Sequence, residues 1–507
     1  MPIPSLPSPW GVGTLGKAAL DFADFLQSAG QSCWQVLPIG PTGYGDSPYQ
    51  PFSSFAGNPY LIDLDGLSQE GLLEPEEYQQ LFWGKDPGKT DYGLLYQKRF
   101  AVLEKAVKRL KIKKNSELRA FCEKEAEWLE DYALFMALKG KFAGAAWNQW
   151  PEPFKRREAK ALALAKKELE EALWFWKGVQ FLFFHQWEIL KRNTRERGIS
   201  IIGDLPIYVA EDSADVWAHP EQFQMDENLH PRKVAGCPPD GFSATGQLWG
   251  NPLFDWQRMK QEGYGWWISR ISFQFRFYDI LRIDHFRGFE SYYAIPWGDK
   301  DASRGTWEKG PGKDFFEALE KTAGKQRIIA EDLGFITSEV KSLLEYTGFP
   351  GMKVLEFAFD SREPSNYLPH NYDKNCVVYT GTHDNETLAG WYRELKKEDK
   401  KFALRYMGRK KLSVNEAVWE IIRLAQSSVA DTCIIPIQDY LCLGNEARIN
   451  HPSTLGGNWI WRLHRDEISK KLVKKIRRMT ELYCRIPEKT EMLLKAEDAE
   501  DLGEEKK

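Results

Sequence analysis

Acidic side chains stand at the ends of several apolar runs in this chain. Taken singly, each acid could cap a helix or join a surface ion pair. Several acids at the carboxyl ends of parallel strands, which meet on one rim in a barrel, are instead typical of an active site. The acids in question are Asp204, Asp284, the adjacent Glu331 and Asp332, and Asp384.

The spacing around Asp284 favours two carboxyl groups with different pKa values. Arg282 and Asp284 are two residues apart, so their side chains point to the same face of a strand. The guanidinium would keep Asp284 ionised, as a covalent nucleophile requires. Glu331 or Asp332, from the neighbouring strand, would have its pKa raised by that charge and by burial, which suits a proton donor. Two such carboxyl groups can cleave glycosidic bonds.

Aromatic residues are unusually frequent. The chain contains 20 Trp, 20 Tyr and 29 Phe residues, and many of them lie in segments rich in Gly and Pro. Sugars pack their C–H faces on aromatic rings, so this composition favours a carbohydrate ligand. A large protein with a Trp-rich core fits the same numbers equally well.

Other chemistries find little support. The chain has no phosphate-binding Gly-rich loop, no dinucleotide-binding fingerprint and no Gly-x-Ser-x-Gly elbow. His285 follows Asp284, and His383 precedes Asp384. Neighbouring residues in a strand point to opposite faces, so neither pair is placed to bind one metal ion together. We therefore expect no metal site and no cofactor.

Charge and composition exclude several classes of protein. The 69 Lys and Arg residues nearly balance the 73 Asp and Glu residues, giving a net charge of −4, so we expect no nucleic-acid partner. No apolar stretch approaches the about 18 residues of a membrane span, and residues 1–10 lack a secretory signal. The 7 Cys residues form no Cys-x-x-Cys pair, which argues against a disulfide framework and a zinc site. We expect a cytoplasmic protein that does not bind membranes.

Short runs rich in β-branched residues alternate with helical stretches. This alternation predicts parallel strands joined by helices, as in an α/β fold of the (β/α)8 (TIM) barrel type. One barrel strand is missing from the pattern, because residues 1–4 include two prolines and make a poor strand. We therefore expect the first barrel strand to be truncated. The predicted strands span residues 33–39, 200–208, 280–285, 327–331, 352–359, 377–380 and 432–437.

The domain organisation follows from the same pattern. Residues 1–507 are predicted to form a single catalytic barrel. Residues 65–197 carry apolar residues at three- and four-residue spacing, which predicts a mainly helical insertion. Residues 210–256 are rich in Pro and Gly and are expected to form a loop-rich insertion over the active-site cleft. Residues 490–507 are acidic and predicted to fray.

Several longer motifs resemble those of the 4-α-glucanotransferases called amylomaltases or disproportionating enzymes, a branch of the α-amylase clan. The resemblance covers nearly the whole chain, from residue 5 to residue 462. Its motifs include residues 43–49 (GYGDSPY), 203–208 (GDLPIY), 282–288 (RIDHFRG), 330–334 (AEDLG) and 381–385 (GTHDN). Departures such as Glu386 and Tyr293 do not affect the proposed acids.

The resemblance implies transfer of α-1,4-glucan segments between malto-oligosaccharides by a retaining mechanism, without a metal or cofactor. It makes Asp284 the nucleophile, Glu331 the general acid/base and Asp384 the transition-state stabiliser. The substrate-binding residues that it implies are Arg282, His383, Asp204, Gln247, Trp249, Asp240, Tyr44 and Tyr49.

Two alternatives remain at this point. The chain could be mainly an α-glucan hydrolase of the same clan, or a non-catalytic glycan-binding protein. We expect a monomer or a weak homo-oligomer, with malto-oligosaccharides and other α-1,4-glucans as its partners.

Overall fold

The computed structural model describes residues 1–43, 45–239, 243–334 and 336–487. Tyr44, Asp240 and the predicted acidic tail at 490–507 therefore lie outside the described residues. None of the helices in the described ranges is long and apolar enough to cross a membrane.

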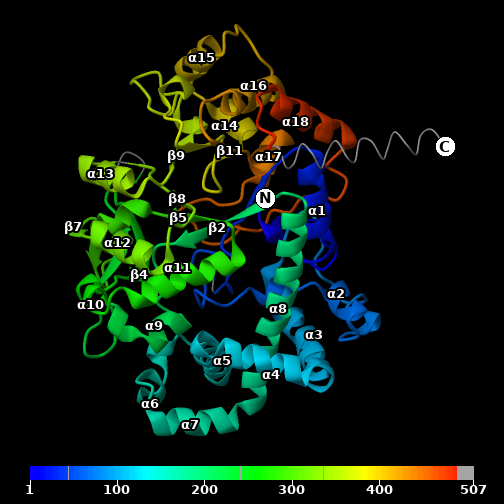
Figure 1. Cartoon of the computed structure of the whole chain (residues 1–507), viewed down its shortest axis with the longest axis vertical. Helices are drawn as coiled ribbons and strands as arrows, with labels where there is room; N and C mark the ends of the chain where they lie inside the picture. The colour runs from blue at the N-terminus through cyan, green and yellow to red at the C-terminus, as the bar shows by residue number, and fades with distance from the viewer. Residues whose placement is uncertain (44, 240–242, 335, 488–507) are drawn as a thin grey trace, which may run out of the picture.

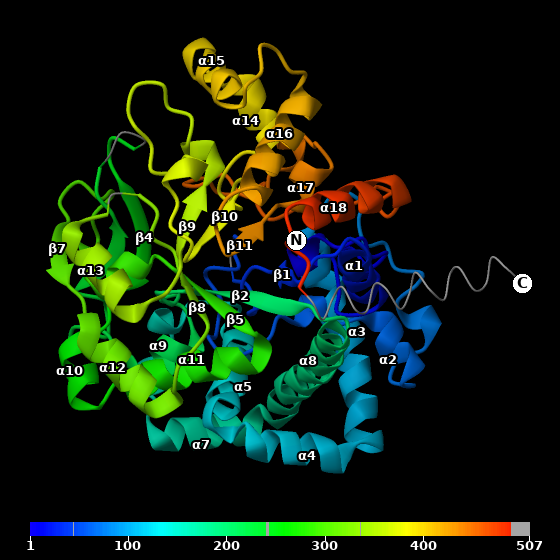
Figure 2. The same ribbon diagram turned by 45° about the horizontal axis from the view of Figure 1, so that its top comes forward.

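Within the described ranges, seven parallel strands form two sheets at the centre of the molecule (Figures 1 and 2). Each strand overlaps one of the seven predicted runs, so these strand predictions are confirmed. The first sheet has the order β1 (Cys33–Gln35), β2 (Ser200–Pro206), β5 (Ile280–Asp284) and β8 (Ile328–Ala330). The second has the order β11 (Thr432–Ile434), β10 (Cys376–Tyr379) and β9 (Gly351–Val354).

The register of the first sheet brings the acidic positions together. Asp204 on β2 lies opposite Arg282 on β5. The backbone N–H of Glu331 donates to the carbonyl of Ile283 at 3.0 Å, so Glu331 continues the pairing of β8 with β5. Asp284 and Glu331 consequently leave their strands at the same carboxyl edge.

The two parallel sheets share a buried apolar cluster. The Ala330 N–H donates to the Pro350 carbonyl at 3.0 Å, so the end of β8 lies next to the start of β9. Strands covered on both faces read as nearly continuous apolar runs, as these do. The shared cluster comprises Ile202, Ile280, Ile329, Met352, Val354, Val377 and Tyr379.

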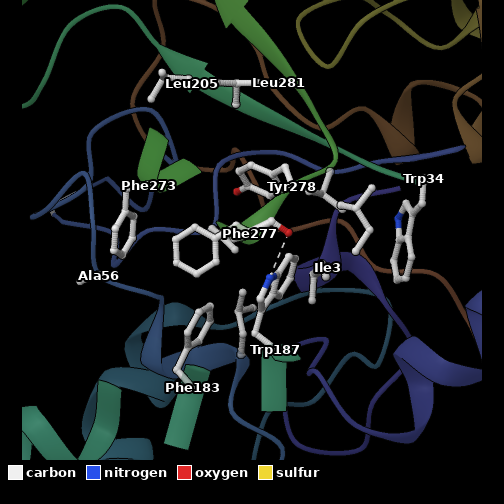
Figure 3. Close-up of a cluster of buried hydrophobic side chains, with 14 of the residues drawn as sticks. Ile3, Trp34, Ala56, Phe183, Trp187, Leu205, Phe273, Phe277, Tyr278 and Leu281 are labelled. Atoms are coloured by element: carbon white, nitrogen blue, oxygen red, sulfur yellow. Dashed lines mark hydrogen bonds between the residues drawn. The ribbon is translucent and has the colours of Figure 1, made fainter. Parts of the chain in front are cut away.

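Aromatic side chains dominate the packing between the first sheet and its helices (Figure 3). Trp187 donates its indole N–H to the Phe277 carbonyl at 3.2 Å. A Cβ atom at Gly203 would lie 2.0 Å from the ring of Tyr278, so only glycine lets this ring pack against β2. Many of the aromatic residues that the composition singled out therefore fill the core.

Helices α3–α8 lie on the side of the strands opposite α14–α16 in both views (Figures 1 and 2). Residues 65–197 are mainly helical, since they contain α3–α8 and most of α2. The helices are α1 (Lys17–Ser28), α2 (Leu64–Gln69), α3 (Tyr92–Lys113), α4 (Asn115–Lys124), α5 (Ala126–Lys141), α6 (Glu152–Lys155), α7 (Ala159–Glu168), α8 (Glu170–Glu196), α9 (Ala214–Ala218), α10 (Trp256–Gln261), α11 (Gly265–Phe277), α12 (Gly312–Ala323), α13 (Ser338–Thr347), α14 (Leu388–Glu394), α15 (Lys397–Tyr406), α16 (Val414–Gln426), α17 (Ile437–Tyr440) and α18 (Lys470–Leu482).

An antiparallel sheet lies beside the parallel strands and was not predicted. Its order is β4 (Gln247–Pro252), β3 (Lys233–Cys237), β6 (Ser291–Pro296) and β7 (Thr306–Lys309). Residues 210–256, predicted to be loop-rich, thus contain β3, β4 and the short helix α9. The sequence pattern did not indicate β3 because its partner β6 comes from a distant segment that follows the predicted nucleophile strand.

The start of the chain is not a strand in the described residues. Ile3–Ser5 forms a short 3-10 helix with Pro at its first turn, and Ile3 is buried. Trp34 of β1 donates its indole N–H to the Met1 carbonyl at 2.8 Å.

Candidate active site

Arg282 links two acids at the carboxyl edge of β2 and β5. Its Nη1 atom donates to both carboxylate oxygens of Asp204 at 2.7 Å, and its Nη2 atom lies 3.0 Å from Oδ1 of Asp284. The Arg282 and Asp204 side chains are only 4% and 1% exposed, whereas Asp284 is 32% exposed. Asp284 is therefore the member of this group that a ligand can reach, and the predicted contact between Arg282 and Asp284 is confirmed.

Burial sets the protonation of the Arg282–Asp204 pair. Loss of hydration raises the pKa of Asp204, and the Arg282 charge opposes this rise. Burial also lowers the pKa of Arg282, but the charges of Asp204 and Asp284 outweigh it, so the pKa stands well above its ordinary value. Arg282 therefore stays cationic at neutral pH.

Glu331 presents both carboxylate oxygens to backbone N–H groups. Oε2 accepts from His285 at 2.7 Å, and Oε1 accepts from Leu333 at 2.8 Å. Loss of hydration and then the charge of Asp284 raise the pKa of Glu331 to about 7, against the lowering effects of Arg282 and the two N–H groups. A carboxyl group with this pKa can give and take a proton near neutral pH.

Asp332 has a different position. Its Oδ1 accepts the backbone N–H of Met352 at 2.6 Å, so this carboxyl group holds the start of β9. Strand spacing left both Glu331 and Asp332 as candidates for the proton donor. Of these two acids, Glu331 is the one next to Asp284.

Asp384 lies on the loop that follows β10. Its Oδ1 accepts from the Asn450 amide at 2.7 Å and lies 3.3 Å from Nε2 of His383, and its side chain is 49% exposed. Both ends of the loop are attached to the buried Asp439: the Thr380 hydroxyl donates at 2.7 Å and the Leu388 N–H at 2.9 Å. The loop therefore holds Asp384 towards solvent while its two ends are fixed.

Tyr49 joins the group around Arg282 to the loop of Asp384. Its hydroxyl donates to Oδ2 of Asp204 at 2.9 Å and lies 3.3 Å from Nδ1 of His383. Its ring stacks on the His383 ring at 4.9 Å, and the Trp459 ring lies 5.9 Å from Tyr49. The predicted residues Asp204, His383 and Tyr49 thus form one continuous network.

Gln247 and Trp249 lie on β4 of the antiparallel sheet. Oε1 of Gln247 accepts the indole N–H of Trp249 at 3.1 Å. The Trp249 ring meets the ring of His285 edge-on, with centroids 4.9 Å apart. β4 therefore reaches the residue that follows Asp284. Tyr44 and Asp240, the other predicted substrate-binding residues, are outside the described residues.

Several residues at the site were not predicted. Asn450 and Trp459 come from the segment after α17, and His285 was considered only as a metal ligand. The resemblance extends to residue 462 and could have flagged this segment, but nothing in the sequence places it beside Asp384. In the described ranges, no group of three His, Cys, Asp or Glu side chains is arranged to hold a metal.

An ion-paired carboxylate beside an acid of raised pKa is the arrangement found in enzymes that act on glycosidic bonds. Comparisons with known proteins agree. A family model described as 4-alpha-glucanotransferase matches residues 1–468. The 4-alpha-glucanotransferase of Clostridium butyricum is 48% identical over 488 residues, covering 96% of this chain and 100% of that protein. That of Thermus thermophilus is 50% identical over 491 residues, covering 95% and 97%.

Solved structures show the same relationship. The amylomaltase from Streptococcus agalactiae in complex with acarbose superimposes with a TM-score of 0.93 at 41% identity, covering 96% of this chain and 98% of that one. The amylomaltase from Corynebacterium glutamicum, at 19% identity and a TM-score of 0.75, shares the fold over 96% of this chain and 73% of that one. The chain belongs to the 4-α-glucanotransferase (amylomaltase) family. It is an enzyme with 4-α-glucanotransferase activity on α-1,4-glucans, so this prediction is confirmed.

Proposed function

We propose that the enzyme transfers glucan segments by a retaining double displacement, with Asp284 as nucleophile, Glu331 as general acid/base and Asp384 as transition-state stabiliser. One observation carries this proposal: the ion pair of Arg282 with Asp284 stands next to Glu331, whose pKa is raised to about 7. Glu331 can thereby carry a proton near neutral pH beside the ion-paired Asp284, as the two roles require.

The first step forms a glucosyl ester. Glu331 gives its proton to the oxygen that bridges two glucose units, Asp284 attacks the anomeric carbon, and the bond from that carbon to the bridging oxygen breaks. In the second step Glu331 takes the proton of an acceptor sugar hydroxyl, the hydroxyl oxygen attacks the same carbon, and Asp284 leaves. The two inversions retain the α configuration.

The remaining residues bind the sugar chain. Asp384 holds the 2- and 3-hydroxyls of the donor sugar and binds them more tightly as the ring flattens and gains positive charge. Arg282, Asp204, His383 and Tyr49 shape the donor-sugar site. The buried Arg282 and Asp204 act there through their contacts with Asp284 and Tyr49. Gln247 and Trp249 cover the acceptor side and exclude water. Tyr44 and Asp240 are assigned to glucan binding by resemblance alone.

The ligands follow from the same assignment. The Streptococcus agalactiae amylomaltase has been solved with acarbose. For this chain, malto-oligosaccharides and other α-1,4-glucans are the proposed substrates, with no metal or cofactor. A cytoplasmic location and a monomeric or weakly oligomeric state remain predictions.

We also propose that both parallel sheets belong to one (β/α)8 barrel. The shared cluster around Ile202 and Met352, the contact of Ala330 with Pro350 and the likeness to the Corynebacterium glutamicum amylomaltase support this arrangement. In this view residues 1–507 form one catalytic unit, with a helical insertion at 65–197 and a cleft-covering insertion at 210–256.

Covalent trapping tests the mechanism. A 5-fluoroglucosyl fluoride with the α configuration reacts through the first step and slows the second, so the ester accumulates. Peptide mass spectrometry should find the label on Asp284, and Asp284→Asn should take up none. A label on another residue would contradict the proposal, as would a β-configured transfer product.

The preference for sugar over water has its own test. Incubation with maltotriose should yield glucose together with chains longer than maltotriose. A product mixture with only shorter chains would show that water is the main acceptor.

A further inference from the structure

His285, the residue after Asp284, has a strained backbone. Its φ is 54°, in the left-handed region that residues other than glycine seldom adopt. Such strain persists only where the surroundings impose it, and it is concentrated at functional sites. The structure shows what this conformation achieves on each side of the residue.

On the backbone side, the conformation points the His285 N–H at the acid/base. This N–H donates to Oε2 of Glu331 at 2.7 Å, and the next N–H, of Phe286, donates to the Glu331 carbonyl at 3.1 Å. The His285 carbonyl in turn accepts from Gly288 at 2.9 Å, within the 3-10 turn Phe286–Phe289. Leaving the left-handed region would swing the first N–H away from Glu331.

On the side-chain side, the imidazole supports the strand over the cleft. It meets Trp249 edge-on at 4.9 Å and 87°, and the Tyr208 ring lies 6.5 Å away. Its Nε2 atom is buried and has no hydrogen-bond partner in the described part of the chain. Loss of hydration lowers the pKa of His285 to about 4, although Asp284 opposes this, so the ring is neutral at pH 7. The neutral ring, whose Nε2 has no polar partner among the described residues, packs against the aromatic rings of Trp249 and Tyr208.

We propose that His285 is a positioning residue that couples the place of Trp249 on β4 to the hydrogen bonding of Glu331. When the Trp249 ring packs against the imidazole, His285 is held in the left-handed conformation and its backbone N–H donates to the carboxylate of Glu331. When Trp249 moves away, the strained backbone relaxes and Glu331 loses this donor. The proposal rests on the acid/base role of Glu331 described above.

The coupling between Trp249 and Glu331 predicts the direction in which the pKa of Glu331 moves. A backbone N–H stabilises the ionised carboxylate, so losing it raises the pKa of Glu331 further. In the pH profile of kcat/KM, the fall at high pH, here called the basic limb, reports the pKa of the acid in the free enzyme. This basic limb then moves to higher pH. Arg282, Asp284 and Arg287 are the other charged groups close to this pair, and none of them is altered in the test.

The test is a double-mutant cycle with His285→Ala, which removes the imidazole and disfavours the left-handed region, and Trp249→Ala, read as the pH profile of kcat/KM for maltotriose disproportionation. Each single variant should move the basic limb up by about half to one pH unit, the size expected for losing one of two hydrogen bonds. The double variant should show the shift of one variant and not the sum. Additive shifts, or no shift in either single variant, would overturn the proposal.

Two further variants make the result specific. Asn adopts the left-handed region more readily than most residues, so His285→Asn should keep the profile near that of the unmodified enzyme and should make it insensitive to Trp249→Ala. If His285→Ala does not fold, this second cycle decides. Trp297→Ala removes another Trp near the same sheet, stacked on His230, and should not move the limb.

Failure of this inference is distinguishable from failure of the proposed function. Glu331→Gln should remove the basic limb together with most of the activity. If it does so while the His285 and Trp249 variants show no shift, only the coupling is wrong. If Glu331→Gln keeps an unchanged profile, the acid/base assignment itself is wrong.

Discussion

At the scale of single residues, the division of labour between Asp284 and Glu331 is an electrostatic one. Asp284 forms an ion pair with the cationic Arg282, whereas Glu331 accepts two backbone N–H groups and faces the charge of Asp284. The two carboxyl groups are thus distinguished by their neighbours and not by their own chemistry. Exchanging those neighbours would exchange the roles.

Asp284→Asn removes the proposed nucleophile while keeping the size of the side chain. We expect kcat for maltotriose to fall by roughly four orders of magnitude or more, since loss of a nucleophile typically has effects of this size. Oligosaccharide affinity, measured by calorimetry, should change little. More than a few per cent of residual kcat would show that Asp284 is not the attacking group.

Glu331→Gln should change how stability depends on pH. The pKa of Glu331 is raised from 4.5 to about 7, so between these values the folded protein holds a proton that the unfolded chain has lost. Stability from this group is therefore present below about pH 4.5 and is lost as the pH rises through 7. The variant lacks this loss, so its Tm relative to the unmodified enzyme should increase from pH 5 to pH 8.

The same variant also tests the acid role. A glucosyl fluoride needs no protonation of its leaving group, so Glu331→Gln should retain much more activity on it than on maltotriose. Equal losses on both donors would indicate that Glu331 serves folding instead of proton transfer.

At the scale of elements, the loop between β10 and α14 is fixed by its ends. Asp439 of α17 accepts from Thr380 before the loop and from Leu388 after it. Burial raises the pKa of Asp439 to about 6, so the carboxyl group is mostly ionised at pH 7 and accepts both donors. The positions of His383 and Asp384 therefore depend on a residue that is almost fully buried.

Asp439→Asn should loosen this loop. The amide has one oxygen where the carboxylate has two, so one buried donor loses its partner, at a cost of about 1–3 kcal/mol. We expect a Tm lower by several degrees and a kcat/KM lower by about tenfold. Asp431→Asn is the matched control, because that side chain is 54% exposed and forms a long ion pair with the exposed Lys374 at 3.7 Å. Equal effects of both changes would contradict the role of Asp439.

The elements also show what sequence reasoning can reach. The period of two in a strand was enough to place Arg282 beside Asp284, and the apolar runs located the parallel strands. The pairing of β3 with β6 joins segments far apart in the chain, and no local pattern specifies such a partner. Strand spacing alone left Glu331 and Asp332 open, and the resemblance chose Glu331. The structure separates the two because Asp332 accepts the N–H of Met352 at the start of β9.

At the scale of the whole molecule, the site is assembled from the full length of the chain. Tyr49, Asp204, His383 and Trp459 come from four separate segments and meet in one network. The contact of Tyr49 with His383 joins residues 334 positions apart. These contacts form only when the sheets are complete, which is why the resemblance assigned most members but could not describe their geometry.

Tyr49→Phe tests this assembly with the loss of one oxygen. Asp204 and His383 each lose a partner, while the stacked ring remains. We expect a rise in KM for maltotriose of about five- to tenfold, the equivalent of about 1 kcal/mol, with kcat less affected. A change in kcat alone would place Tyr49 in the chemical step instead of in substrate binding.

The antiparallel sheet bears on recombination between related enzymes. β3 pairs with β6, and β6 follows the nucleophile strand β5 after one short 3-10 turn. A chimera that exchanges only the hairpin 233–252 would join a foreign β3 to a native β6 and disturb their register. Crossovers placed before β3 and after β7 would exchange the antiparallel sheet together with Asp284. Such hybrids should form products of the same lengths as the enzyme that supplied this segment.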